Sequence, residues 1–84
     1  MKPIRLTAHA AAYIEKRGFS TAEVEEAIRQ EDWAPAERER LACRRDFAFN
    51  GVWSGKRYGT KQVRPIFVEE PDEIVVVTVY VYYF

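Results

Sequence analysis

The chain has 84 residues, with 13 basic and 13 acidic side chains that cancel to a net charge of zero, and a single cysteine. This length favours one domain spanning residues 1–84, and one cysteine excludes an intramolecular disulfide. No apolar stretch reaches the ~20 residues of a membrane-spanning helix. Residues 1–6 are too short and polar for a signal peptide. We therefore expect a cytoplasmic protein that does not enter a membrane.

The first part of the chain predicts a short strand at residues 2–6 and then two helices. Thr7 is a suitable N-cap for a helix over residues 8–17, which Gly18 ends as a left-handed C′ residue. Ser20 and Glu23 form a capping-box pattern, which predicts that a second helix begins there and continues towards Arg29.

The second part of the chain predicts three strands. Residues 37–49 alternate between apolar and arginine-rich positions, and Asn50-Gly51 favours a hairpin connection over residues 50–60. Residues 61–69 form the next predicted strand, in which Pro65 indicates an edge position or a bulge. After a turn at 70–73, residues 74–84 are a run of β-forming side chains. The order β-α-α-β-β-β predicts an α+β fold with two N-terminal helices packed on an antiparallel sheet.

Side chains of the last strand alternate between two faces. We expect one face to be covered by the helices. It carries Val75, Val77, Val79, Val81 and Tyr83. The opposite face becomes hydroxylated and aromatic towards its end, and we expect that end to border a groove or solvent. It carries Ile74, Val76, Thr78, Tyr80, Tyr82 and Phe84.

Charge is unevenly distributed along the chain. Residues 33–64 hold eight basic and three acidic side chains, whereas residues 65–84 hold four acidic side chains and no basic one. A local basic surface can bind phosphates even when the whole chain is neutral. One histidine and one cysteine far apart predict no metal site, and the scattered glycines match no nucleotide-binding loop. We therefore expect no cofactor.

The basic and aromatic side chains are typical of proteins that bind single-stranded RNA, in which cations hold phosphates and rings stack on bases. RNA cleavage by the 2′-hydroxyl needs a base, an acid and cations, but no metal. His9, Tyr80 and Arg64 are the candidate catalytic residues, and the alternative for His9 is an ordinary helix histidine. Candidate RNA-binding residues from this pattern are Arg40, Arg44, Arg45, Lys61 and Tyr82. Their alternative role is that of solvated charges and sheet-face residues.

Four segments resemble a small bacterial family of unknown function that is related to the RelE-like and BrnT-like toxins. They are TAH at 7–9, KRGFS at 16–20, EVEEAI at 23–28 and VVVTVY at 75–80. The resemblance implies a RelE/barnase-like fold and a ribonuclease toxin that acts on RNA such as mRNA and is held by an antitoxin protein. His9, Arg17, Thr78 and Tyr80 match the family's motif residues, which adds Arg17 and Thr78 to the candidate RNA-binding set. Arg45, Lys61 and Arg64 lie in corresponding strands.

Two functional hypotheses follow. The first is a metal-independent ribonuclease toxin of a toxin–antitoxin pair, which binds RNA on the basic and aromatic face of the sheet. The second is a non-catalytic protein-interaction module, or an inactive relative of such toxins, that associates through its C-terminal strand and forms a homodimer or binds a partner. A long uncharged strand at a sheet edge favours such association.

Overall fold

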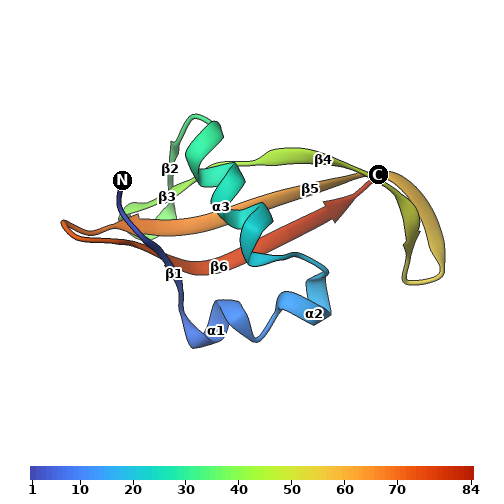
Figure 1. Ribbon diagram of the computed structural model, residues 1–84, viewed down its shortest axis with the longest axis horizontal. Coiled ribbons are helices and arrows are strands. Elements are labelled where there is room, and N and C mark those ends of the chain that lie inside the picture. Colours follow the sequence, from blue (N-terminus) through green and yellow to red (C-terminus); the bar gives the residue numbers. More distant parts are fainter.

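The computed structural model describes residues 1–84 as three short helices and a six-stranded sheet (Figure 1), which confirms the predicted α+β class. The helices are α1 (Ala8–Ala11), α2 (Ile14–Arg17) and α3 (Thr21–Gln30), and a 3-10 turn, η1, covers Glu37–Glu39. The strands are β1 (Ile4–Leu6), β2 (Ala34–Ala36), β3 (Arg40–Ala42), β4 (Arg45–Trp53), β5 (Lys56–Glu69) and β6 (Ile74–Tyr83). None of the helices has the length and apolar character needed to cross a bilayer.

The predicted helix ends are confirmed. The Thr7 side chain accepts a hydrogen bond from the Ala10 N–H, Gly18 adopts a left-handed conformation (φ 76°), and Ser20 and Glu23 form a reciprocal capping box. The prediction of one helix over residues 8–17 is wrong, because the chain breaks into α1 and α2 at Tyr13. The Tyr13 N–H bonds to the Ala10 carbonyl, three residues back, and this tighter bond turns the chain at the break.

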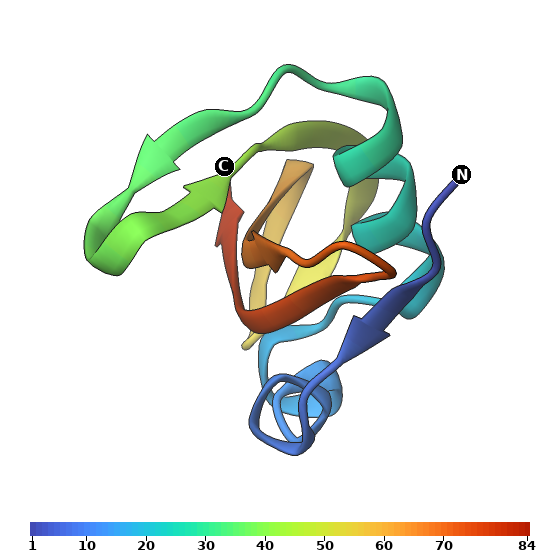
Figure 2. The same cartoon turned by 90° about the vertical axis from the view of Figure 1, so that its left-hand side faces the viewer.

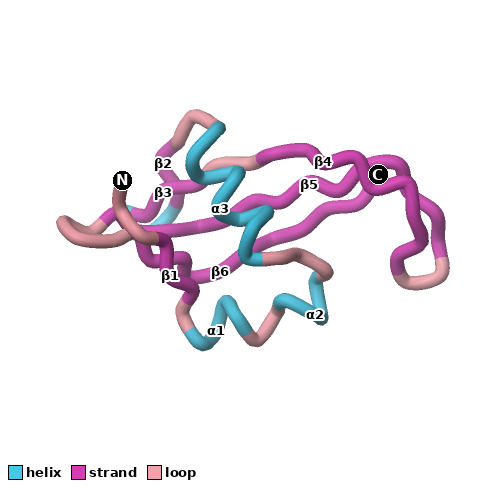
Figure 3. Tube along the Cα trace, in the orientation of Figure 1, coloured by secondary structure: helices cyan, strands magenta, loops and turns pink.

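The sheet is mixed rather than antiparallel, which corrects the expected arrangement. Its strands are the magenta segments of Figure 3. Its order is β1-β6-β5-β3-β2, with β4 also pairing with β5, and β1 runs parallel to β6. β5 is therefore central, and the edge position predicted for Pro65 is wrong. Pro65 lies opposite Cys43, in the gap between the end of β3 at Ala42 and the start of β4 at Arg45, and its carbonyl accepts a hydrogen bond from the Cys43 N–H at 3.4 Å. Proline has no N–H to donate in return, so the ladder is interrupted at this pair.

A β-bulge in β6 changes which side chains are buried. Phe67 pairs with Val76 and Ile66 pairs with Thr78, which leaves Val77 without a partner on β5. Ile74 and Val76 before the bulge and Val79 after it are buried. The predicted helix-facing row is therefore wrong at Val75 and Val77 and right at Val79. A bulge, the alternative suggested by Pro65, is present on the strand paired with it.

The remaining corrections concern the middle of the chain. The single strand predicted over 37–49 is divided into η1, β3 and the first half of β4. The hairpin turn is at Ser54 and Gly55, both with positive φ, as in a type I′ turn. Asn50 instead takes a left-handed conformation within β4, where the register with β5 shifts. Gly51 then continues β4 opposite Tyr58.

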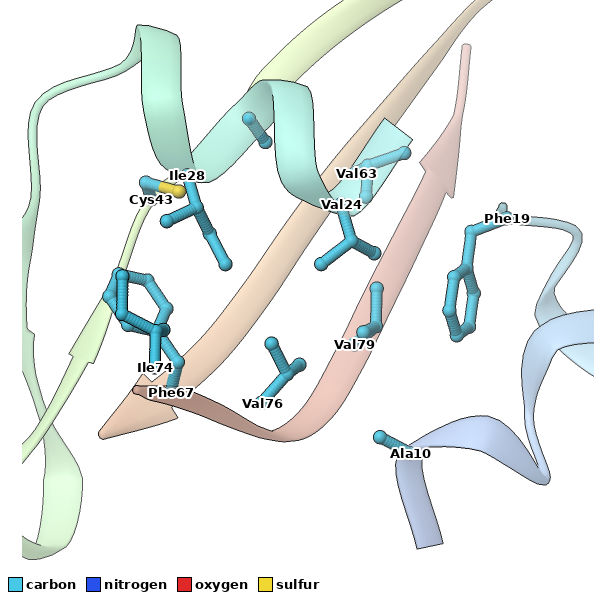
Figure 4. Packing of buried hydrophobic residues seen from close by; sticks show 11 residues of the cluster. Ala10, Phe19, Val24, Ile28, Cys43, Val63, Phe67, Ile74, Val76 and Val79 are labelled. Carbon is cyan, nitrogen blue, oxygen red and sulfur yellow. The ribbon is translucent and has the colours of Figure 1, made fainter. Parts of the chain in front are cut away.

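The helices leave one face of the sheet uncovered. α3 crosses the sheet over β5, and α1 and α2 lie beside β6 (Figure 1). The core between these helices and the sheet includes Phe19, Val24, Ile28, Val63, Phe67, Val76 and Val79 (Figure 4). β2, η1 and β3 form an arm that projects away from the helices (Figure 2). We call the face opposite α3 the open face. It carries Gln62, Arg64, Ile66, Val68, Val75, Val77, Thr78, Tyr80 and Tyr82.

Candidate functional site

The main hollow on the open face lies between the arm and strands β5 and β6 and has a volume of about 880 Å³. It brings together five residues that the sequence singles out, from three separate strands. These are Arg40, Arg64, Thr78, Tyr80 and Tyr82. The other lining residues are Pro35, Ala36, Glu37, Arg38 and Ile66. We call this hollow the arginine–tyrosine groove.

Strand register places the two tyrosines of the groove. Arg64 of β5 lies opposite Tyr80 of β6, and Ile66 lies opposite Thr78, so that these side chains are cross-strand neighbours roughly 5 Å apart at Cβ. Tyr80 is 41% exposed and Tyr82 is 48% exposed. Their spacing of two residues puts both rings on one face, about 6.6 Å apart along the strand. The rings therefore offer two successive stacking surfaces beside an arginine.

The arm supplies two further groove residues: Arg38, one of the basic residues of 33–64, and Glu37, which the sequence does not single out. They lie in the turn between β2 and β3, which closes at the pair Ala36 and Arg40. Arg38 and Glu39 both have φ of 59°, a left-handed conformation that is uncommon for residues other than glycine. No glycine or asparagine marks the turn, so the sequence gives no local signal for it. Strained residues of this kind concentrate at functional sites.

The groove is electropositive. It contains Arg38, Arg40 and Arg64 and one carboxylate, that of Glu37. None of the three arginines takes part in an ion pair within the chain. Their guanidinium groups are therefore available to an anionic ligand, and arginine can bind phosphate oxygens through two parallel hydrogen bonds.

Arg17 borders the groove but its guanidinium is held within the chain. It donates a hydrogen bond to the Val79 carbonyl at 2.8 Å and a longer one to Thr78 Oγ1 at 3.4 Å. The same group lies 4.0 Å from the ring centre of Tyr13 and 5.3 Å from that of Tyr80. Arg17 thus supports the Tyr80 ring by a cation–π contact. This geometry assigns it to positioning Tyr80 more readily than to holding a phosphate.

His9 is exposed on α1 and does not line the groove. Its ring packs edge-on against Tyr13, with 5.0 Å between ring centres. Tyr13 and Arg17 therefore separate His9 from Tyr80 in a series of ring and cation contacts. The structure does not bring the two candidate proton-transfer groups into contact.

Arg45 and Lys61 lie on the helix side of the sheet, where carboxylates of α3 and of the residue after it neutralise them. Arg45 contacts Glu26 and Glu31, at 3.1 and 2.6 Å, and these hydrogen bonds raise the pKa of Arg45. Lys61 lies 2.8 Å from Glu23 and also donates to the Gly18 carbonyl. These two cations therefore hold α3 against the sheet and do not line the groove. Arg44 is exposed and shares a smaller hollow with Arg64 beside the groove.

Cys43 has the properties of a structural cysteine. Its side chain is buried, with 5% exposed, and burial, together with the nearby charge of Glu31, raises the pKa of the thiol to about 11. The thiolate is the nucleophilic form, so a raised pKa disfavours catalysis by Cys43. No group of three or more His, Cys, Asp or Glu side chains gathers in a way that could hold a metal ion.

No protein-family model, curated protein or solved structure matches this chain. The groove combines three unpaired arginines, two exposed phenols and one carboxylate on a solvent-accessible sheet face. These groups can bind a phosphate chain, stack on planar rings and exchange protons.

Proposed function

We propose that the protein is a metal-independent endoribonuclease that binds single-stranded RNA in the arginine–tyrosine groove. The observation that carries this proposal is the position of two exposed tyrosines beside three arginines that have no ion-pair partner. Single-stranded RNA binders combine aromatic stacking surfaces with cations along the phosphate chain. The groove offers both in one hollow open to solvent.

The binding mode follows from the two walls of the groove. One wall, on β6, presents the Tyr80 and Tyr82 rings, on which adjacent bases stack. The other wall, on the arm, presents Arg38 and Arg40, which bind the phosphates. Arg64 lies between them as the cross-strand neighbour of Tyr80, so that a phosphate beside the Tyr80 base meets its guanidinium.

The proposed reaction is attack of a 2′-hydroxyl oxygen on the adjacent phosphorus. The bond between this oxygen and phosphorus forms and the bond to the 5′ oxygen breaks, which yields a 2′,3′-cyclic phosphate and a 5′-hydroxyl. Glu37, the carboxylate of the groove, accepts the 2′-hydroxyl proton, and the Tyr80 phenol donates a proton to the leaving oxygen. Arg64 stabilises the additional negative charge of the transition state. His9, which lies outside the groove, is the alternative base that the sequence resemblance implies.

The biological context that we propose is a toxin–antitoxin pair. It is supported by the resemblance of residues 7–9, 16–20, 23–28 and 75–80 to relatives of the RelE-like and BrnT-like toxins. On this proposal the sheet and helices are a variant of the RelE/barnase-like architecture. An antitoxin protein would inhibit the enzyme by covering the groove.

The test is an RNA-cleavage assay with purified protein in the presence of a chelator. We expect cleavage of a single-stranded substrate, with a loss of about 100-fold or more in Tyr80→Phe, Arg64→Met and Glu37→Gln, since each removes one group of the proposed reaction. Tyr13→Phe is the matched control, because it removes a phenol one arginine away from the groove.

Each variant has a distinct meaning. Full cleavage activity in Tyr80→Phe would show that Tyr80 is not the acid. Reduced activity in His9→Ala together with full activity in Glu37→Gln would show that His9, and not Glu37, is the base. If the wild-type protein neither binds nor cleaves single-stranded RNA, alone or with ribosomes, the proposal is wrong.

The second candidate function is a protein-interaction module that uses the outer edge of β6. β1 pairs only with residues 74–76 of that edge, so that the rest of the edge has no strand partner. Phe84, just beyond it, is 59% exposed. The Arg17 guanidinium already donates a hydrogen bond to the Val79 carbonyl on this edge. A partner strand therefore has to displace Arg17 or pair only with residues after Val79. Protection of the Val81 and Tyr83 amides from hydrogen exchange by a partner, without RNA cleavage, would favour this function.

A further inference from the structure

The open face carries opposite charges at its two ends. The arginine–tyrosine groove is the basic end. The turn between β5 and β6, residues 70–73, is the acidic end and borders a second hollow of about 490 Å³. Glu73 in this turn is paired with Arg5 at 3.0 Å, which lowers the pKa of the Glu73 carboxyl. Glu70 and Asp72 are exposed and form no ion pair. We call residues 70–73 the acidic turn.

Between these two ends the open face is apolar. Val68, Val75 and Val77 line the second hollow, and Ile66 lines the groove. Because Val68 pairs with Val75 in the same ladder that pairs Ile66 with Thr78, the two hollows adjoin along β5 and β6. We call Ile66, Val68, Val75 and Val77 the apolar strip. Ile66 is buried and the three valines are half-buried, and no helix covers this strip.

We propose that a second copy of this chain docks on the open face around a two-fold axis through the apolar strip. A two-fold rotation reverses the direction of the strands, so that the acidic turn of each copy enters the groove of the other. The positions match: Glu70 and Arg64 lie three residues to either side of Phe67, about 10 Å from the axis. Along the chain, Asp72 of the acidic turn and Tyr82 of β6 lie five residues to either side of Val77. Such an isologous contact closes as a dimer.

Charge complementarity favours this occupant. The chain is neutral as a whole, yet its unpaired charges on the open face are negative at one end and positive at the other. A two-fold contact brings unlike charges together at both ends and apolar side chains together in the middle. If the groove binds RNA as proposed above, dimerisation and RNA binding are mutually exclusive. The dimer itself does not depend on that function.

The test is sedimentation velocity of the full chain over a range of protein concentrations at low and high salt. We expect a monomer–dimer equilibrium that weakens as salt rises, because salt screens the exposed charges. Val77→Asp, which places a charge at the axis, is expected to be monomeric. Glu70→Lys with Asp72→Lys, and separately Arg40→Glu with Arg64→Glu, are each expected to weaken the dimer roughly tenfold or more.

Mixing the two charge-reversed proteins gives the decisive result. Each of them repels its own copies, but the lysine turn of one fits the glutamate groove of the other, so that the mixture is expected to form a heterodimer. Glu15→Lys, an exposed change on α2, is the matched control and should dimerise as the wild type does. Circular dichroism melts establish that every variant is folded.

A wild-type protein that stays monomeric at all concentrations would overturn the proposal, as would a dimer indifferent to both charge reversals. The result is separable from the proposed enzyme function, because the Glu70→Lys, Asp72→Lys protein keeps the whole groove. RNA cleavage by that variant without dimerisation would support both proposals. Dimerisation of the wild type without RNA cleavage would support the proposed dimer and contradict the proposed ribonuclease function.

Discussion

The phenol of Tyr83 donates a hydrogen bond to the main-chain carbonyl of Arg17 at 2.9 Å. This bond ties the end of the last strand to the joint between α2 and α3. The Trp53 ring stacks on Tyr83, with 4.8 Å between ring centres, and the two rings close over Gly18. Burial, together with the nearby Glu23, raises the pKa of Tyr83 above its ordinary value of 10.0, so that the phenol keeps its donor role further into the alkaline range.

Gly18→Ala should destabilise the protein strongly. Gly18 has φ of 76°, and a Cβ there would meet the Tyr83 hydroxyl and lie 2.7 Å from the Trp53 ring. The left-handed backbone costs about 1 kcal/mol for alanine and the overpacking about 1–3 kcal/mol. Urea unfolding should therefore show a loss of about 2–4 kcal/mol.

Gly55→Ala separates the two contributions. Gly55 also has positive φ, 82°, but no atom lies within 4 Å of the position that a Cβ would occupy. Only the backbone cost of about 1 kcal/mol is expected there. Equal losses in the free energy of unfolding at the two glycines would show that the Tyr83 and Trp53 rings move aside for a methyl group at Gly18, and would contradict the expected overpacking.

Lys61→Met should weaken the attachment of α3 to the sheet. The Lys61 side chain is 12% exposed, and its ammonium bonds to Glu23 and to the Gly18 carbonyl. Hydrogen bonds between charged groups contribute about 1.5–3 kcal/mol when little exposed, so we expect a loss of that size in urea unfolding. Arg44→Met, an exposed cation on the other side of the sheet, should change the stability by no more than about 0.5 kcal/mol.

Cys43 should resist thiol reagents in the folded protein. Its folded pKa is about 11, compared with an ordinary value of 9.0. Because the pKa is raised in the folded state, the contribution of Cys43 to the free energy of unfolding is fully present below about pH 9. It is lost as pH rises towards 11, since only the thiol of the unfolded state ionises in this interval. Native protein at pH 8 should react slowly with an aromatic disulfide and rapidly in urea. Cys43→Ala should remove this part of the alkaline decline, and an unchanged decline would contradict the assignment.

Arg17→Met should affect the groove through Tyr80. It removes the cation beside the Tyr80 ring and the hydrogen bond to the Val79 carbonyl. If the groove cleaves RNA as proposed, a mispositioned acid should lower kcat about tenfold and leave KM within about twofold. Altered Tyr80 ring resonances in NMR spectra would identify the cause. A rise in KM with unchanged kcat would instead show that Arg17 binds the substrate.

The sequence alone determined the features that depend on neighbouring residues. The Thr7 cap, the Gly18 helix end and the Ser20–Glu23 capping box are each satisfied within three or four positions, so that their residue types are sufficient to predict them. The β-forming run at 74–83 and the α+β class follow in the same way from composition and alternation. The candidate residues Arg64 and Tyr80 meet in one groove because they occupy paired positions on adjacent strands, and Tyr82 joins them because it lies two residues beyond Tyr80 on the same face.

Only the tertiary structure decided which side of β6 is buried and which cations are free. The bulge at Val77 reverses the alternation, and it exists because of pairing between residues distant in sequence. Arg45 and Lys61 look like phosphate ligands in the sequence, but the packing of α3 places Glu23, Glu26 and Glu31 against them. A side chain's type sets its chemistry, whereas its partners depend on how the whole chain folds.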